Sequence, residues 1–281
     1  MKSRKLLSFA AAMIIFSGCQ MPQKKEVAPA VAETDQQIRQ SLQERFEKAI
    51  PLKANGQCSL FYYAKGKARR ENFPVQLWVN PPSEIYMQGD VAFNAKGVVL
   101  GSNEEQFWFA LAPKEISSYW WGEWSRQTSL STMMINPRVV LEGMGVVKID
   151  EKQQWTFSRE DAYKVLINQE DSKVKRIYVD ERDGLIRRIE YVGVEGEAVT
   201  VTELDKYITV SEAFSVPTQI KIIRRLTHVK QGTMSITLKL SSVKPADFTQ
   251  QQRQFLFQRK PMAGFKHIYE VIDGKVVEQQ Q

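Results

Sequence analysis

The spacing of hydrophobic residues along this chain changes from helical to strand-like near residue 57. Before that point, apolar side chains recur at every fourth position: Ile38, Leu42, Phe46 and Ile50. This period predicts an amphipathic helix over residues 36–52, and Asp35 is placed to cap its first turn. We expect the apolar stripe to pack against the domain that follows, although a helix that binds a partner would show the same pattern.

From residue 57 to residue 244, the pattern is that of a β protein. Short runs rich in Val, Ile, Tyr, Phe, Trp and Thr alternate with turn residues. The segment Arg182-Asp183-Gly184 separates two such runs, 174–180 and 185–192, and is a strong hairpin signal. Consecutive strands joined by short turns predict an antiparallel meander.

A short helix is predicted in the middle of this series. Asn136 and Pro137 suit its cap and first turn, and Gly143 and Gly145 suit its end. A single long sheet must cover its apolar face, so it either closes as a barrel or curls around helices. A curled sheet with helices over it would enclose an apolar cavity.

The first residues of the chain have the composition of an export signal. A basic end with three cations precedes an apolar stretch, Leu6–Phe16, which is shorter than the roughly 20 residues needed to cross a bilayer. Small residues then lead directly to Cys19, an order that resembles the lipobox of bacterial lipoproteins. The resemblance implies removal of residues 1–18 and a lipid on Cys19, with residues 19–35 as a flexible tether. An ordinary cleaved signal followed by a chance cysteine is the alternative.

Charge and cysteine content argue against nucleic-acid binding and against a cysteine-rich metal site. The formal charge of +7 includes the three cations of the signal, which leaves +4 after cleavage. The remaining basic residues come as scattered pairs rather than as a continuous patch, so we do not expect nucleic-acid binding. Lipidation of Cys19 would leave Cys58 as a single thiol, which excludes an internal disulfide and a cysteine-rich metal site. Because Cys58 lies in a strand-like run, we expect it to be buried and inert.

No constellation of residues in the sequence points to catalysis. The two histidines, His228 and His267, lie outside ligand spacing of each other and of any cysteine. The sequence contains neither a glycine-rich phosphate loop nor a nucleophile elbow. We therefore predict a protein that is not an enzyme, without catalytic residues, metal or cofactor. A hydrolase whose carboxylates meet in a groove is the alternative.

Aromatic residues are concentrated in one part of the chain. Four of the six tryptophans lie within residues 108–124. Strand alternation places Phe107 and Phe109 on one face and Trp108 on the other. Such a strand is either covered on both faces, as an all-β core requires, or partly exposed to an apolar ligand.

Five sets of short motifs follow one another in a recognisable order along residues 57–272. They are Val79-Asn80-Pro81-Pro82-Ser83-Glu84-Ile85, then Leu100–Phe109, then Ile177-Tyr178-Val179-Asp180 with Asp183–Ile189, then Ser215–Ile220, and finally Phe255-Leu256-Phe257 with Pro261 and Gly264. In this order they resemble the LolA/LolB-like superfamily, which includes lipoprotein members.

The resemblance implies a mainly β (α+β) fold for residues 53–272. We expect an open antiparallel half-barrel of about eleven strands, with helices capping an apolar cavity, and a disordered tail at 273–281. The residues expected to line the cavity are Leu77, Val79, Ile85, Met87, Leu100, Phe107, Trp108, Phe109, Trp120, Met133, Met134, Ile177 and Ile189.

Two features of the resembled family concern single side chains. The receptor type of the family projects an apolar side chain from a loop between early strands, a role that Val91 or Phe93 would take here. A strand that runs through with a bulge is the alternative. The soluble carrier type has an arginine that latches its lid where this sequence has Tyr86.

These observations predict a lipid-anchored protein of the cell envelope. It would bind the acyl chains of a lipid or lipoprotein in the cavity, as in lipoprotein sorting or lipid transfer. The alternative is a structural or sensory envelope lipoprotein that binds a protein partner through the same fold. Gln20 after the lipidated cysteine carries no retention signal, which in the resembled lipoproteins implies the outer membrane, facing the periplasm.

Overall fold

The computed structural model describes residues 34–64, 66–91, 94–112, 117–126, 136–150, 152–170, 173–193, 198–212, 214–226, 232–260, 263–273 and 275–279. The predicted signal segment, Cys19 and most of the tether lie outside these ranges, and so do Phe93, Met133 and Met134. None of the helices within the ranges combines the length and the apolar character that a bilayer crossing requires.

The described residues form fifteen strands, three α-helices and one 3-10 helix. The strands are β1 (Leu52–Ala64), β2 (Lys67–Asn80), β3 (Glu84–Val91), β4 (Asn94–Ser102), β5 (Gln106–Leu111), β6 (Ser118–Glu123), β7 (Trp155–Glu160), β8 (Tyr163–Glu170), β9 (Lys173–Asp180), β10 (Ile186–Val192), β11 (Ala198–Ser211), β12 (Phe214–Leu226), β13 (Gly232–Pro245), β14 (His267–Ile272) and β15 (Lys275–Glu278). The helices are α1 (Asp35–Glu47), η1 (Trp124–Arg126), α2 (Pro137–Gly143) and α3 (Gln250–Leu256).

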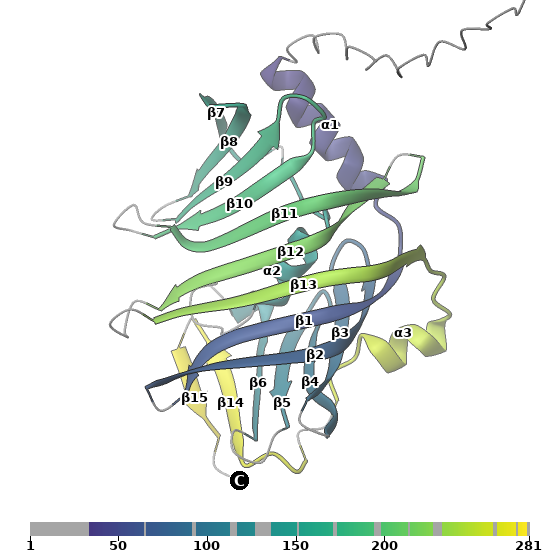
Figure 1. The fold of residues 1–281 in the computed structure, drawn as a ribbon, viewed down its shortest axis with the longest axis vertical. Coiled ribbons are helices and arrows are strands. Elements are labelled where there is room, and N and C mark those ends of the chain that lie inside the picture. Colours follow the sequence, from purple (N-terminus) through teal and green to yellow (C-terminus); the bar gives the residue numbers. More distant parts are fainter. Residues whose placement is uncertain are drawn as a thin grey trace, which may run out of the picture. The chain divides into compact units, whose positions relative to one another are not determined.

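All fifteen strands belong to one open sheet, in the order β15-β14-β6-β5-β4-β3-β2-β1-β13-β12-β11-β10-β9-β8-β7 (Figure 1). The mainly β, open architecture is therefore as predicted, but about eleven strands was too few. Neighbouring strands are antiparallel except for β14, which pairs with β6 in parallel. The chain leaves β13, passes through α3 and enters the sheet beside β6, so this pair is joined by a long connection rather than by a hairpin.

Residues 275–278 form a strand, within the segment 273–281 that was predicted to be a disordered tail. β15 pairs with β14 in a hairpin that runs from Ile272↔Lys275 to Tyr269↔Glu278. A sheet edge pairs through backbone groups, so β14 supports a further strand although all four residues of β15 are exposed.

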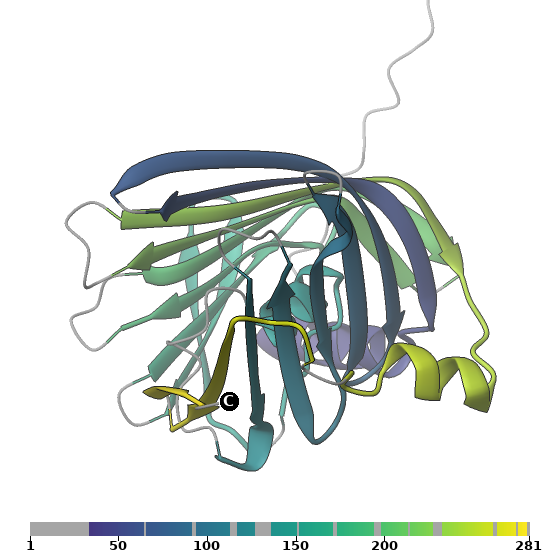
Figure 2. The same ribbon diagram turned by 90° about the horizontal axis from the view of Figure 1, so that it is seen from below.

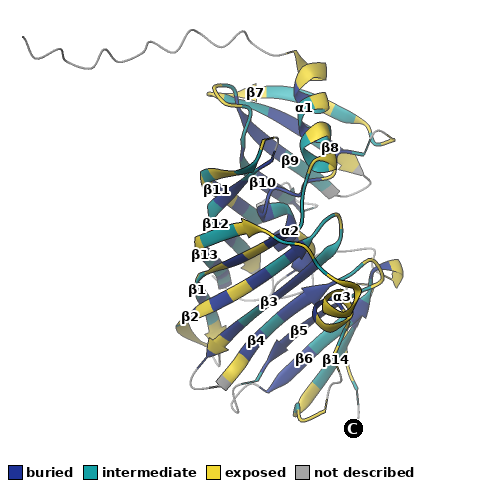
Figure 3. Cartoon of the chain, turned by 90° about the vertical axis from the view of Figure 1, so that its right-hand side faces the viewer, coloured by how far each residue is buried: buried dark blue, intermediate teal, exposed yellow. Residues whose placement is uncertain are grey.

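The two faces of the curled sheet are covered by different helices. Figure 2 shows α1 and α2 against the concave face and α3 on the outer side. Leu77 and Leu100, which point into the concave face, pack in one core with Ile38 and Leu42 of α1 and with Val140 of α2. Figure 3 shows that the outward sides of α1 and α3 are exposed, whereas β3 and β5 are largely buried.

α1 forms one residue earlier than predicted and ends sooner. Thr34, not Asp35, is the N-cap, and it forms a capping box with Gln37. The prediction that the apolar stripe packs against the domain is confirmed, because Ile38 and Leu42 are buried in the core. Asp35 instead accepts a hydrogen bond from Lys164 of β8 at 2.8 Å, which fixes the start of α1 to the sheet.

α2 matches the sequence prediction closely. The side chain of Asn136 accepts from the backbone N–H of Arg138 at 2.9 Å, and Pro137 occupies the first turn. Beyond the helix, Gly145 has φ +88°, a left-handed conformation that favours glycine and turns the chain away.

The predicted hairpin at 180–185 is confirmed and is fixed by a buried carboxylate. Asp180, which is 1% exposed, accepts two hydrogen bonds from the Arg182 guanidinium, at 3.0 and 2.7 Å, and one from Arg187 at 3.3 Å. These bonds, with the backbone N–H of Arg182, favour the charged carboxylate over the buried neutral form. They hold the pKa of Asp180 down at about 2.

We expect Asp180→Asn to lower the free energy of unfolding at pH 7 by about 2 kcal/mol. In the unfolded chain the pKa of an aspartate is about 3.9. A carboxyl whose pKa is lower than this in the folded chain stabilises the protein at any pH above about 3.9. The stabilisation is lost as the pH falls through the folded pKa, so the difference between variant and parent should shrink from about pH 4 towards pH 2. Urea unfolding across this range measures it, and Asp205→Asn on an exposed strand position is the control. Equal losses in the two variants would contradict the assignment.

Candidate functional site

The concave face brings together most of the residues predicted to line a cavity. Eight of them belong to the main core on this face, each at most 1% exposed: Leu77, Val79, Ile85, Met87, Leu100, Phe109, Ile177 and Ile189. They come from β2, β3, β4, β5, β9 and β10, on strands from both halves of the sheet. These eight residues therefore belong to one continuous apolar core.

The predicted aromatic residues divide between the two faces. Trp120 packs at the rim of the concave core, stacked between Phe109 at 5.6 Å and Tyr269 at 5.3 Å. Phe107 lies in a small separate cluster with Trp124 and Val271.

Trp108 points to the opposite, convex face, so it is not part of the concave set. This is the side that strand alternation predicts for it. There Trp108 is 1% exposed in a cluster with Leu256 and Phe257, so the strand is covered on both faces.

Val91 does not project from a loop. It ends β3 with its side chain 6% exposed in the concave core, and the β3–β4 register shifts between Gly89 and Val91. The bulge of the alternative is present, but the strand does not run through: β3 ends at Val91, which pairs with Asn94 at the start of β4. Tyr86 lies on the convex face, where its ring is 5.6 Å from that of Trp78, and so it is remote from any latch on the concave side.

α2 occupies the middle of the concave face, where the cavity was expected. Its residues Val139, Val140, Leu141 and, just beyond, Met144 are at most 5% exposed and belong to the same core as the strands. The approach is close: a Cβ built on Gly143 would lie 2.9 Å from Cγ2 of Ile220 on β12. In the part of the chain that the structure describes, side chains of α2 thus fill the space under the sheet.

A polar cluster fixes α2 in this position. Glu142 accepts a hydrogen bond from Lys175 Nζ of β9 at 2.6 Å and one from the Tyr191 hydroxyl of β10 at 2.5 Å. The side chains of Glu142 and Lys175 are each 16% exposed, so the ion pair is shielded from water. Burial, and then the neighbouring Glu142, raises the pKa of Tyr191 well above its ordinary value, which keeps the hydroxyl a donor. We call Glu142, Lys175 and Tyr191 the α2 anchor.

The α2 anchor was missed by reasoning from the sequence. Its one signal is a charged residue within a short helix whose other inward positions are apolar. A single charge at such a position needs a partner, but Lys175 and Tyr191 lie on strands that only the fold brings to it.

The concave side also holds Cys58, as expected for a buried thiol. It is 3% exposed within the main core, and burial raises its pKa to about 12, so the reactive thiolate is disfavoured. His267 is exposed and lies 2.8 Å from Glu278, while His228 is outside the described residues. Among the described side chains, no group of three or more His, Cys, Asp or Glu is placed to hold a metal ion.

Comparison with solved structures identifies the fold. A LolA superfamily protein from Nitrosomonas europaea is similar with a TM-score of 0.50 and 12% identity, over 81% of this chain and 99% of that one. A putative outer membrane lipoprotein-sorting protein domain from Vibrio parahaemolyticus is similar with a TM-score of 0.52 and 9% identity, over 77% and 94%. No family model and no curated protein matches the sequence. The chain therefore has the LolA-type fold that its ordered motifs resemble.

Proposed function

We propose that this protein is anchored in the cell envelope by a lipid on Cys19, and that its concave face receives acyl chains of a lipid or lipoprotein in place of α2. The observation that carries the proposal is the continuous apolar concave face, which is covered in its middle by a helix of only seven residues. The fold, shared with a lipoprotein-sorting domain, and the lipobox-like order at Cys19 support the same reading.

Burial of an acyl chain and burial of the apolar side chains of α2 contribute free energies of similar size. A 16-carbon chain transferred from water would gain on the order of 10 kcal/mol before ordering costs. The buried Val139, Val140, Leu141 and Met144 together account for roughly 8 kcal/mol on the same scale. An acyl chain that replaced these side chains would therefore bind in a nearly balanced exchange, which suits a carrier that must also release its cargo.

Two apolar features that could serve a protein partner are used in packing. The apolar stripe of α1 is buried against the sheet, and Trp120 and Trp121 pack against the concave and convex clusters respectively. Neither therefore offers a surface that favours a protein partner over an acyl chain.

A reversible disulfide between α2 and the sheet tests the proposal. The short distance from Gly143 to Ile220 means that Gly143→Cys with Ile220→Cys places two Cβ atoms within the roughly 3.5–4.5 Å that a disulfide spans. In the mature chain with Cys19→Ser, we expect the reduced pair to take up a fluorescent fatty acid and the oxidised pair to lose most of that uptake. Fluorescence titration before and after a reductant measures both states in one protein.

The parent chain treated with the same oxidant and reductant is the control, since Cys58 is buried and has no disulfide partner. Uptake that is equal in the oxidised and reduced forms would show that the probe does not replace α2. Absence of uptake in the reduced form and in the parent would remove the proposed function altogether.

A further inference from the structure

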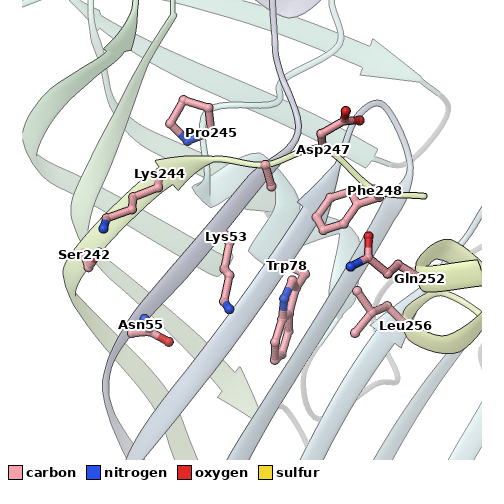
Figure 4. Close-up of a pocket in the computed structure, with 11 residues that line it drawn as sticks. Lys53, Asn55, Trp78, Ser242, Lys244, Pro245, Asp247, Phe248, Gln252 and Leu256 are labelled. Carbon is pink, nitrogen blue, oxygen red and sulfur yellow. The ribbon is translucent and has the colours of Figure 1, made fainter.

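A pocket on the convex face lies on the side of the sheet opposite to α2 (Figure 4). Its volume is about 400 Å³, within the roughly 300–1,000 Å³ of small-molecule sites. β1 and β2 form its floor, the end of β13 and the following residues form one wall, and α3 forms the other.

One side of the pocket is apolar and rigid. Trp78, Phe248 and Leu256 line it. The Trp78 ring lies against Tyr86 with centroids 5.6 Å apart, and the Phe248 ring meets Phe257 edge-on at 5.4 Å. These neighbours fix the orientation of the indole, which forms a flat apolar platform.

The other side of the pocket carries polar side chains. Lys53, Asn55 and Lys244 line it, and the Lys53 Nζ stands 5.9 Å from the centroid of the Trp78 ring. Among the described residues, no hydrogen bond or ion pair engages the side chains of Asn55 and Lys244. A few polar groups beside apolar and aromatic side chains match the mixed lining of small-molecule sites, in which the polar groups orient the ligand.

The pairing of β1 with β13 is irregular beside the pocket. The β1–β13 register shifts between Asn55 and Gly56, and the Ser241 hydroxyl donates to the Asn55 carbonyl at 3.3 Å. A β-bulge of this kind aims the adjacent side chains away from the regular pleat and is common beside binding sites.

The wall formed by α3 is also fixed in place. Two hydrogen bonds, both 3.1 Å, join the Arg253 guanidinium to Glu84 of β3. The Ala246 N–H donates to the Pro51 carbonyl at 2.9 Å, which ties the segment before α3 to the start of β1. These contacts hold the walls of the pocket in place, so binding would not have to order them.

We propose that this pocket binds a sugar ring that carries a negatively charged group. The apolar C–H face of a pyranose fits the Trp78 platform, because such a surface stacks on an aromatic ring without needing hydrogen bonds on that side. The Asn55 amide is placed for ring hydroxyls. Lys53 and Lys244 outnumber the acidic Asp247 in the lining, which selects an anionic substituent.

Calorimetric titration of the mature chain tests the proposal with five probes. We expect glucose 6-phosphate to bind, with glucose, inorganic phosphate and glycerol 1-phosphate each at least about tenfold weaker, because each lacks the ring or the charge. Galacturonic acid, with a carboxylate in place of the phosphate, then distinguishes an acidic sugar from a phosphorylated one. Binding of glycerol 1-phosphate as tight as that of glucose 6-phosphate would overturn the ring site in favour of simple phosphate binding.

Substitutions in the lining test whether glucose 6-phosphate binds in this pocket. Trp78→Leu and Lys53→Met should each weaken glucose 6-phosphate at least about tenfold. Lys239→Met, at an exposed position of β13 that does not line the pocket, is the matched control and should change nothing. Lys53→Met removes only a charge from an exposed position, so it remains decisive if Trp78→Leu fails to fold. Unchanged binding in Lys53→Met, or no binding of any sugar probe to the parent, would overturn the proposal.

Discussion

Glu142→Ala is expected to lower the free energy of unfolding by about 3 kcal/mol and to loosen α2 on the concave face. The carboxylate is 16% exposed and holds both Lys175 and Tyr191, so its removal leaves a shielded ammonium and a buried hydroxyl without their partner. Leaving such groups unpaired costs more than the net value of the pair itself. Urea unfolding measures the first effect, and hydrogen exchange of the α2 amides, about a hundredfold faster, measures the second.

Glu203→Ala is the matched control for this prediction. Glu203 pairs with Lys221 at 3.0 Å, but the two side chains are 49% and 43% exposed, and an exposed pair contributes only about 0–1 kcal/mol. If Glu142→Ala cost no more than Glu203→Ala, the α2 anchor would have no role in holding the helix. On the proposed function, the loosened variant should also take up a fatty-acid probe faster than the parent.

Gly101→Ala is the second substitution with a large expected effect, at about 3 kcal/mol of destabilisation. Gly101 on β4 is paired with Trp108 on β5, and a Cβ at residue 101 would lie 2.3 Å from the indole atoms Cε2 and Cζ2. Trp108 is 1% exposed under α3 and the segment that follows it, so the ring has no free space to move into. Thermal or urea unfolding of the variant checks the value.

A double-mutant cycle separates this clash from a general loss of packing. Trp108→Leu alone should destabilise the protein by leaving a cavity, but it also vacates the space above Gly101. The double variant should therefore be more stable than the sum of the two single changes predicts, by about 2 kcal/mol. Strict additivity would mean that Gly101 is required for a reason other than the indole.

Local patterns predicted local structure well in this chain. Alternation placed Phe109 and Trp108 on opposite faces, and the cap and turn residues located α2 and the β9–β10 hairpin. Each of these features depends on residues within a few positions of one another. The same is true of the helical stripe of α1, although its cap lies one residue earlier than predicted and its end at Glu47 rather than at residue 52.

Long-range pairing could not be predicted in the same way. The cover over Trp108 comes from a segment far along the chain, where Asn103 donates to the Phe257 carbonyl at 3.0 Å and Tyr119 to that of Lys260 at 3.2 Å. The pattern of residues near position 108 does not predict that this distant segment covers the indole. The parallel β14–β6 pair and the Glu142–Lys175 contact likewise depend on where the fold brings distant segments, and Trp78, half-buried on a strand, gave no separate signal of a pocket.

The position of β1 in the sheet has a consequence for how the chain matures. β1 pairs with β2 on one side, but its other edge is completed only by β13, for example at Leu60↔Ile236. At the pace of translation, roughly 5–20 residues per second, the partner of that edge emerges on the order of ten seconds after β1 itself. Until then β1 presents an unsatisfied backbone ladder next to an apolar face, the combination most prone to wrong pairing with another nascent chain. The sheet is thus a product of the finished polypeptide, and a chaperone or an unfolded export route that delays folding would protect it during synthesis.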